Sequence, residues 1–473
     1  MRQRSLWLPL IGVLATLALA GSAAAMATTW SNAIEVPGTA TLNSGADAKV
    51  YSVSCAAAGQ CAAGGYYKDG SGGSQAFVVS EKRGHWGKAI EVPGTAALNT
   101  GASSKVSVVS CGAPGDCAAG GYYKQGSGHF QAFLVTEKRG RWGKAVRVPG
   151  TATLNAGGSG FLNAISCAAA GECAAGGTYR DASAHDQAFL VTEKRGRWGK
   201  AVEVPGTAAL NIGDGSAGLF AVSCSAVGEC AASGQYTDGS GHNQAFFVSE
   251  KHGRWGKAAP IPGLPLLNVG GVASVKSVSC AAVGECSAGG FYKDGSGHLQ
   301  PFVVNEKRSH WGKAVQVPGT ATLNVGAHAL LTTVSCRAAG ECAAGGYYAD
   351  GSGAYQAFVA DEKHGSWGAA IEVPGTAALN TDGNAVVNSV SCVGVGRCVA
   401  GGYYAGGSTY QPFLVSETHG QWGNATDVPG SLNAGGDGLV YSVSCVATGA
   451  CAAGGSYEDA AAKPQAFVVS GKP

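Results

Sequence analysis

The residues of this sequence whose type and spacing could most readily do chemistry are its 16 cysteines. They form eight Cys-x5-Cys pairs, namely Cys55 and Cys61, Cys111 and Cys117, Cys167 and Cys173, Cys224 and Cys230, Cys280 and Cys286, Cys336 and Cys342, Cys392 and Cys398, and Cys445 and Cys451. Zinc sites use shorter spacings and gather four ligands, and no histidine stands at a fixed place beside these pairs. Redox catalysis would require Cys-x-x-Cys or a single reactive thiol. An even number at constant spacing predicts eight disulfides, each within its own repeat.

An export signal at the start of the chain supports this prediction. An apolar run from Leu6 to Ala20 follows two arginines and precedes small residues that suit cleavage after Ala25 or Ala27. The run is short for a membrane anchor, and no later segment is apolar enough to span a bilayer. We therefore expect residues 1–27 to be a signal peptide and residues 28–473 to form one secreted, extracellular, monomeric domain.

Other chemical motifs are weak. Charged residues make up 13% of the chain and the formal net charge is +2, so we expect no basic surface that could neutralise phosphates and no nucleic-acid partner. One carboxylate per loop, such as Asp69, is too few for a calcium cage. The sequence contains no P-loop, nucleophile elbow or His-Glu-x-x-His motif, and no acid and base pair stands out from the repeat. We assign no catalytic residue, cofactor or metal.

A unit of about 56 residues repeats eight times, and each copy reads as four short strands. In the first copy the strands are expected at 50–55, 61–67, 75–81 and 85–93, separated by turns rich in Gly, Asp and Ser. Their order predicts an antiparallel meander. The Cys-x5-Cys and Lys-Arg-Gly turns should share one face, and the Asp-Gly-Ser-Gly turns and the Pro-Gly-Thr connections the other.

The two ends of the chain complement each other. The last copy stops before its fourth strand, whereas the chain after the signal opens with such a strand, around Trp30 to Val36. A four-stranded sheet repeated in this way can close around an axis, whereas an open solenoid would need polar caps. We predict an all-β, eight-bladed β-propeller of four-stranded antiparallel blades, closed by pairing the N-terminal strand into the last blade.

The repeated S-V-S-C-x5-C-A-A-G-G core with a following E-x-x-G-x-W resembles secreted bacterial β-propeller repeat proteins, a family of mostly unknown function. The resemblance covers nearly all of the chain after the signal and implies the architecture. Sialidase-type propellers are similar only at Gly84 and Trp86 of their S-x-D-x-G-x-T-W turn, and no arginine triad can be placed. Quinoprotein dehydrogenases share a G-x-x-x-W motif but carry a vicinal cysteine pair that this chain lacks.

Comparison of the eight copies isolates invariant positions, represented by Asn43, Tyr67, Gln75 and Phe77, and Glu81 in all copies but the last. They could form eight equivalent ligand sites, as in multivalent lectins. The favoured interpretation is structural: aromatic rings fill the core between blades, Asn occupies a turn with positive φ, and Gln and Glu satisfy loop amides.

The connections between the fourth strand of one copy and the first strand of the next vary most. If they converge at the axis, they form a rim of differing loops on a rigid scaffold, where binding specificity usually resides. The candidate rim residues are Asp47, Lys49, Lys105, Asp214, Asp382, Asn384 and Asp437. This pattern favours an extracellular binding or adhesion module for a glycan or protein. The alternatives are a secreted hydrolase or lyase that acts on polysaccharide at the central funnel, and a purely structural surface protein.

Overall fold

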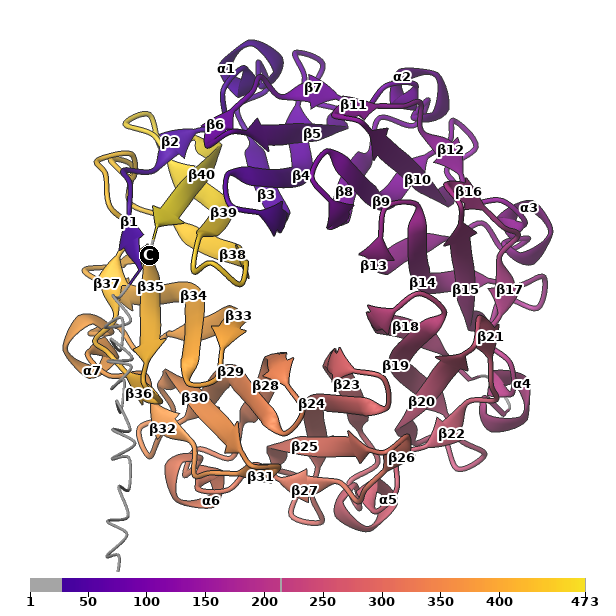
Figure 1. The fold of residues 1–473 in the computed structure, drawn as a ribbon, viewed down its shortest axis with the longest axis vertical. Coiled ribbons are helices and arrows are strands. Elements are labelled where there is room, and N and C mark those ends of the chain that lie inside the picture. The colour runs from indigo at the N-terminus through magenta and orange to yellow at the C-terminus, as the bar shows by residue number, and fades with distance from the viewer. Residues whose placement is uncertain (1–27, 213–214, 473) are drawn as a thin grey trace, which may run out of the picture.

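A computed structural model describes residues 28–212 and 215–472 (Figure 1). The predicted signal peptide and the candidate rim residue Asp214 lie outside the described residues. Eight antiparallel sheets surround one axis, which confirms the predicted eight-bladed propeller. We number the blades from the sheet of β3 to that of β38.

Each blade contains three long strands, which are named here by their distance from the axis. The inner strands are β3 (Ala48–Ala57), β8 (Ser104–Ala113), β13 (Phe161–Ala169), β18 (Gly218–Ala226), β23 (Ala273–Ala282), β28 (Ala329–Ala338), β33 (Val386–Gly394) and β38 (Leu439–Cys445). The second strands are β4 (Gln60–Lys68), β9 (Asp116–Lys124), β14 (Glu172–Arg180), β19 (Glu229–Thr237), β24 (Glu285–Lys293), β29 (Glu341–Ala349), β34 (Arg397–Gly406) and β39 (Cys451–Glu458). The third strands are β5 (Ser74–Lys82), β10 (Phe130–Lys138), β15 (Asp186–Lys194), β20 (Asn243–Lys251), β25 (Leu299–Lys307), β30 (Tyr355–Lys363), β35 (Thr409–Thr418) and β40 (Pro464–Lys472).

The predicted fourth strand is interrupted, and forms two short segments that both pair with the third strand. The first segments are β1 (Thr29–Trp30), β6 (His85–Trp86), β11 (Arg141–Trp142), β16 (Arg197–Trp198), β21 (Arg254–Trp255), β26 (His310–Trp311), β31 (Ser366–Trp367) and β36 (Gln421–Trp422). The second segments are β2 (Ile34–Glu35), β7 (Ile90–Glu91), β12 (Val146–Arg147), β17 (Val202–Glu203), β22 (Ala259–Pro260), β27 (Val315–Gln316), β32 (Ile371–Glu372) and β37 (Thr426–Asp427). A contact with the neighbouring blade interrupts the strand. The Ala89 amide does not pair within its own sheet and instead donates to the Pro37 carbonyl of the preceding connection at 2.7 Å.

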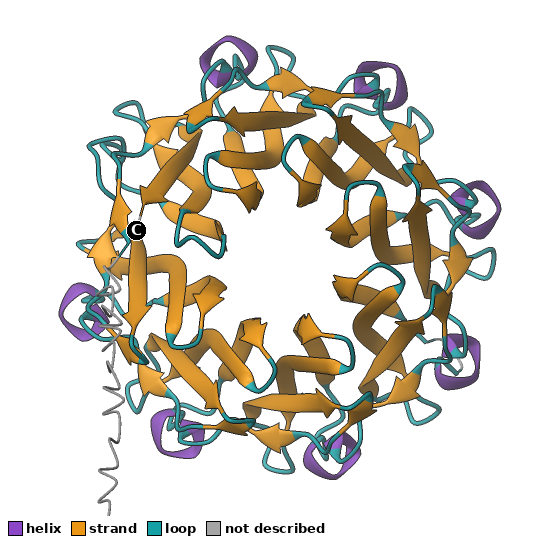
Figure 2. Ribbon diagram, in the orientation of Figure 1, coloured by secondary structure: helices purple, strands orange, loops and turns teal. Residues whose placement is uncertain are grey.

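One helical turn lies in seven of the eight connections, at the outer edge of the ring (Figure 2), and it was not predicted. These turns are α1 (Thr39–Leu42), α2 (Thr95–Leu98), α3 (Thr151–Leu154), α4 (Thr207–Leu210), α5 (Leu264–Leu267), α6 (Thr320–Leu323) and α7 (Thr376–Leu379). In α1, Gly38 reverses the chain with φ 88°, and the buried Thr39 hydroxyl donates to the Val36 carbonyl at 2.7 Å. Each turn thus holds a connection in place across the interface between two adjacent blades, which we call a seam.

The two termini close the ring as predicted. Strands β1 and β2 both pair with β40, so that the N-terminal segment supplies the outer edge of blade 8 (Figure 1). Both ends of the described chain therefore belong to the same sheet.

The hydrophobic core lies between blades rather than within a single blade. Phe77 and its counterparts are fully buried, and Tyr67 packs with residues of the preceding blade. The small residues of the second strands permit this packing, because a Cβ placed on Gly64 would lie 2.6 Å from Cγ1 of Val106 in the next blade. This confirms the interpretation that Gly allows neighbouring blades to approach.

The turns occupy the two faces that the sequence predicted. We call the face with the disulfides the stapled face; there the Gly84 amide of a Lys-Arg-Gly turn donates to the Gly59 carbonyl of a Cys-x5-Cys turn at 3.0 Å. On the opposite loop face, the Gly45 amide of a connection donates to the Lys68 carbonyl at 2.9 Å. All eight cysteine pairs are bridged within their own repeats. None of the described helices has the length and apolar character needed to cross a bilayer.

Candidate functional site

The invariant Asn and Gln form structural links between blades. Asn43 Nδ2 donates to Gln465 Oε1 of the preceding blade at 2.8 Å, and its Oδ1 accepts the Asp47 amide at 2.8 Å. The prediction of a positive φ is wrong, because Asn43 has φ −82° and acts through its side chain. Asn43, Tyr67 and Phe77 are buried, which argues against eight ligand sites built from these residues.

The recurring Glu also faces a seam rather than solvent. In blade 1, the Ser470 hydroxyl donates to Glu81 Oε1 at 2.9 Å and accepts from Trp86 Nε1 at 3.1 Å. Burial raises the pKa of Glu81, and the hydrogen bond from Ser470 partly offsets this effect. The Trp, the hydroxyl and the Glu therefore connect adjacent blades beneath the stapled face.

Blade 7 departs from this arrangement, because Asp361 occupies the place of the hydroxyl residue. Trp422 Nε1 donates to Asp361 at 3.0 Å, and burial raises the pKa of the Asp361 carboxyl. The pKa of Glu417 is raised to about 7, mainly by burial and to a smaller extent by the charge of Asp361. The sequence analysis did not note this pair of acidic groups, which comparison of the eight copies at this position could have revealed.

The aspartates of the Asp-Gly-Ser-Gly turns have a local role. Asp69 Oδ1 accepts the Ser71 and Gly73 amides at 2.9 and 3.0 Å, and Oδ2 accepts from Gln75 Nε2 at 2.7 Å. Hydrogen bonds from Ser71 and Gln75 lower the pKa of Asp69, so the carboxylate stays ionised. No group of three or more His, Cys, Asp or Glu that could hold a metal ion occurs among the described residues.

Three of the candidate rim residues lie together at the loop-face ends of the inner strands of blades 1 and 2. Asp47 accepts from the Tyr66 hydroxyl at 2.8 Å and pairs with Lys68 at 3.1 Å. Lys49 is paired with Tyr66 across β3 and β4. The Lys105 ammonium lies 4.5 Å from the centre of the Tyr51 ring and 5.5 Å from that of Tyr122.

The remaining described rim residues gather separately, around Tyr410 at the start of β35. Asn384 Nδ2 donates to the Tyr410 hydroxyl at 3.1 Å, and Asp437 accepts the Tyr410 amide at 2.8 Å. Asp382 accepts the Ser408 amide of the neighbouring turn. These polar side chains are occupied in fixing loops, and the structure does not join them to Asp47, Lys49 and Lys105 in one site.

A β-bulge in every inner strand places one variable residue toward the next blade, a feature that the sequence analysis missed. The ladder skips a residue at this point, for example Tyr51 between Val50 and Ser52, and a bulge re-aims the side chain. The residues at the bulges are Tyr51, Ser107, Asn163, Phe220, Lys276, Thr332, Asn388 and Tyr441. Three of the polar residues at the bulges bond the next blade: Asn163 Nδ2 donates to the Leu219 carbonyl at 3.0 Å, and Thr332 and Asn388 donate to the carbonyls of Val387 and Val440.

Where the bulged residue is aromatic, half-buried rings cluster near the axis. Tyr51 contacts Tyr66 and Tyr441, with ring centres 5.8 and 5.4 Å apart. With Lys105 and Tyr122, these residues make a continuous group that we call the aromatic arc. Burial raises the pKa of Tyr51 to about 12 and lowers the pKa of Lys105. The arc thus combines neutral phenols with a partly desolvated cation.

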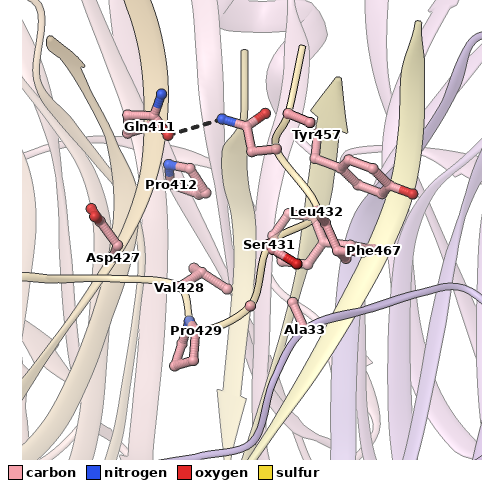
Figure 3. Close-up of a pocket in the computed structure, with 13 residues that line it drawn as sticks. Ala33, Gln411, Pro412, Asp427, Val428, Pro429, Ser431, Leu432, Tyr457 and Phe467 are labelled. Atoms are coloured by element: carbon pink, nitrogen blue, oxygen red, sulfur yellow. Dashed lines mark hydrogen bonds between the residues drawn. The ribbon is translucent and has the colours of Figure 1, made fainter. Parts of the chain in front are cut away.

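A pocket of about 200 Å³ opens between blades 7 and 8 (Figure 3). The connection Pro-Gly-Ser-Leu-Asn at 429–433 is two residues shorter than its counterparts and forms no helical turn. As a result Val428 is half-buried, although the equivalent Val36 is fully buried. Val428, Leu432, Tyr457 and Phe467 contribute apolar walls to this pocket.

No protein-family model and no curated protein sequence matches the chain. Solved propellers resemble it in fold. The lectin BP39L from Burkholderia pseudomallei is 14% identical, with 81% of this chain and 99% of the lectin covered and a TM-score of 0.43. The Hadza microbial sialidase Hz136 is 10% identical, with 73% of each chain covered and a TM-score of 0.38. The Aleuria aurantia lectin is 10% identical, with 68% and 95% covered and a TM-score of 0.32. These likenesses concern the fold and identify no ligand.

Proposed function

We propose that this protein is a secreted extracellular binding module and that the aromatic arc on its loop face contacts a glycan. The arc carries the proposal, because the half-buried rings of Tyr51 and Tyr441 occupy inner-strand bulges at which the repeats differ. Aromatic rings offer flat apolar faces to sugar rings, and nearby charged groups can bond hydroxyls. Asp47, Lys49 and Lys105 lie beside the rings and supply such groups. Eight disulfides fit an oxidising extracellular location.

The tyrosines of the arc support a single site of this kind per molecule. At the seam between blades 4 and 5, Lys276 lies 5.9 and 5.3 Å from the ring centres of Phe220 and Phe291, and the bulged aromatic residue there is Phe. Tyr51, Tyr66 and Tyr441 come from blades 1 and 8, and the equivalent bulges in blades 2 and 3 carry Ser107 and Asn163. Equivalent sites at every seam would require the same residues in every repeat. We therefore expect one glycan per chain, held near the axis on the loop face.

A glycan array with the mature chain, followed by calorimetry on the best ligand, tests the proposal. Tyr51→Ala and Tyr441→Ala should each raise the dissociation constant roughly tenfold, which corresponds to a loss of about 1.4 kcal/mol of binding free energy. Val395→Ala removes an exposed side chain from a Cys-x5-Cys turn on the stapled face and serves as the matched control. Unchanged affinity in both tyrosine variants, at unchanged melting temperature, would contradict the proposed site.

The hydrolase alternative would need an acid and base pair within reach of a substrate. The carboxyl groups of Asp361 and Glu417 are the paired acids that the structure reveals, but Glu417 is only 4% exposed and lies between blades. We therefore assign this pair to the pH dependence of a seam and not to catalysis.

A further inference from the structure

The exposed basic residues of the protein are concentrated in one segment of the repeat. This segment runs from the end of the third strand to the second residue after the first outer segment, and in blades 1 to 5 it holds seventeen of the chain's 32 Lys and Arg residues. All seventeen are exposed, and we call them the basic crescent: Lys82, Arg83, Lys88, Lys138, Arg139, Arg141, Lys144, Lys194, Arg195, Arg197, Lys200, Lys251, Arg254, Lys257, Lys307, Arg308 and Lys313. The expectation that the protein has no basic surface is therefore wrong.

The crescent covers only part of the ring. The same segment contains Lys363 in blade 6, no Lys or Arg in blade 7, and Lys472 in blade 8. The outer segments of blades 1 to 5, from β6 to β26, follow one another along the outer edge of the ring (Figure 1). The positive charge therefore forms a curved band over five consecutive blades.

Carboxylates near this band are fewer than its cations. Glu172 and Glu285, in the adjacent Cys-x5-Cys turns, accept the backbone amides of Arg195 and Arg308 at 3.0 Å and leave the guanidinium groups without an ion pair among the described residues. Each segment contains one carboxylate, but Glu81 and its counterparts are buried, and burial raises their pKa. The ion pairs found between described residues involve none of the seventeen Lys and Arg side chains. Aspartates such as Asp69 and Asp294, whose pKa is lowered, lie on the loop face and contribute to the low formal net charge of +2.

Several crescent lysines are held in place at the seams. Lys82 Nζ donates to the Gly140 carbonyl of the next blade at 2.8 Å, and Lys138 Nζ donates to Gly196 at 2.8 Å. Lys194 and Lys307 make the same contact with Gly253 and Gly365, each at 3.0 Å. An ammonium group has three donors, so two remain for a ligand at each of these seams. The crescent therefore contains a lysine ammonium group that is held in the same position at several successive seams.

We propose that the basic crescent binds a linear anionic polysaccharide that follows the outer edge of the ring from blade to blade. Lys and the forked guanidinium of Arg both bind carboxylate and sulfate groups, and a repeated row of cations matches a polymer with repeated charges. Double-stranded DNA is a poorer fit, because its persistence length of about 150 base pairs makes bending around a convex edge costly, whereas a single polysaccharide chain is more flexible. The crescent is distinct from the aromatic arc, which lies on the inner and second strands.

The test measures binding of the mature chain to dextran sulfate and to polygalacturonate, with neutral dextran as the reference polymer. We expect binding to both anionic polymers, none to neutral dextran, and a steep loss of affinity between 50 and 200 mM NaCl, on the order of tenfold or more. Arg139→Gln, Arg141→Gln and Arg197→Gln combined should weaken binding at least tenfold. The control, Lys363→Gln, Lys463→Gln and Lys472→Gln combined, makes the same change in net charge outside the crescent.

Equal effects of the two triple variants would show attraction to overall charge and overturn the proposal. Tighter binding to duplex DNA, or binding only to phosphatidylglycerol vesicles, would replace it with a nucleic-acid or membrane surface. Tyr51→Ala should leave binding of dextran sulfate unchanged. Failure of the aromatic arc and failure of the basic crescent can therefore be distinguished.

Discussion

Trp30 lies directly opposite Gly471 in the short antiparallel pair that closes the ring. In blade 1 the equivalent Trp86 lies opposite Glu81 instead. A Cβ on Gly471 would lie 2.7 Å from Thr28 Cγ2 and 3.1 Å from Trp30 Cε3, which is closer than side chains normally pack. The departure of the last repeat from the common sequence is therefore fitted to the N-terminal segment that pairs with it.

Removal of residues 28–36 should destabilise the whole ring. The deletion takes away β1 and β2, leaves β40 as an unpaired edge, and uncovers the apolar residues beside Val36. We expect aggregation or a melting temperature lower by several degrees than that of the chain starting at Thr28, measured by scanning calorimetry. Melting curves that coincide for the two chains would refute closure by the N-terminal segment.

Peptide mapping without reduction should recover eight linked pairs, each confined to one repeat, beginning with Cys55 and Cys61. In the chain-entropy description, each bridge closes a short loop and stabilises the fold by about 2 kcal/mol. Dithiothreitol should therefore lower the melting temperature of the native protein. Free thiols, or peptides that join different repeats, are the results that would contradict the assignment.

The seam between blades 6 and 7 should respond to pH. The pKa of Glu417 is raised from 4.5 to about 7 by burial and by Asp361, so the folded state holds the proton more tightly than the unfolded state. This contribution to stability is full below about pH 4.5 and is lost as the pH rises through about 7. Asp361→Ser, which installs the hydroxyl found at Ser80, should raise the melting temperature at pH 8 by about 1–2 °C and change it little at pH 4.5.

Glu372→Gln, a change at the outer edge of blade 6, serves as the control for this experiment, because Glu372 bonds the Tyr348 hydroxyl and lies outside the acidic pair. A gain in stability from Asp361→Ser that is the same at pH 4.5 and pH 8 would show that the pair does not titrate as described.

Restoring the missing helical turn should close the pocket between blades 7 and 8. Replacing Ser431 by Thr-Ala-Thr recreates the sequence of α1 and should bury Val428 as Val36 is buried. We expect a higher melting temperature, because apolar area leaves water. The matched control inserts two residues in the exposed turn at Gly407, and an insertion at 431 that stabilises no more than this control would contradict the structural explanation of the pocket.

Much of the fold could be predicted because each repeat contains the residues that specify its strands and turns. The spacing of Cys55 and Cys61, the turn residues and the complementary ends specify strands, staples and closure. The interruption of the fourth strand could not be predicted, because the Ala89 amide finds its acceptor, Pro37, in the preceding connection. The one-turn helices also depend on such contacts over a seam.

The candidate site was predicted less well, for a different reason. Asp47, Lys49 and Lys105 lie near one another in the structure, whereas Asp382, Asn384 and Asp437 were grouped with them only because their connections vary. The bulge at Tyr51 depends on pairing with β4 and has no local signal in one copy. Asp361 and the basic crescent could have been found by comparing the same position through all eight copies, since averages over the chain conceal them.

The pairing of Thr29 with Lys472 also determines when the protein can become complete during synthesis. Blades 1 to 7 can each assemble from a continuous stretch of chain as it emerges, but blade 8 must wait for the final residues. Until then the first segment has no partner and the apolar faces of blades 1 and 7 are both uncovered. Strand β40 is therefore the one that gives the N-terminal segment its place, and a chain that lacks β40 remains an open ring.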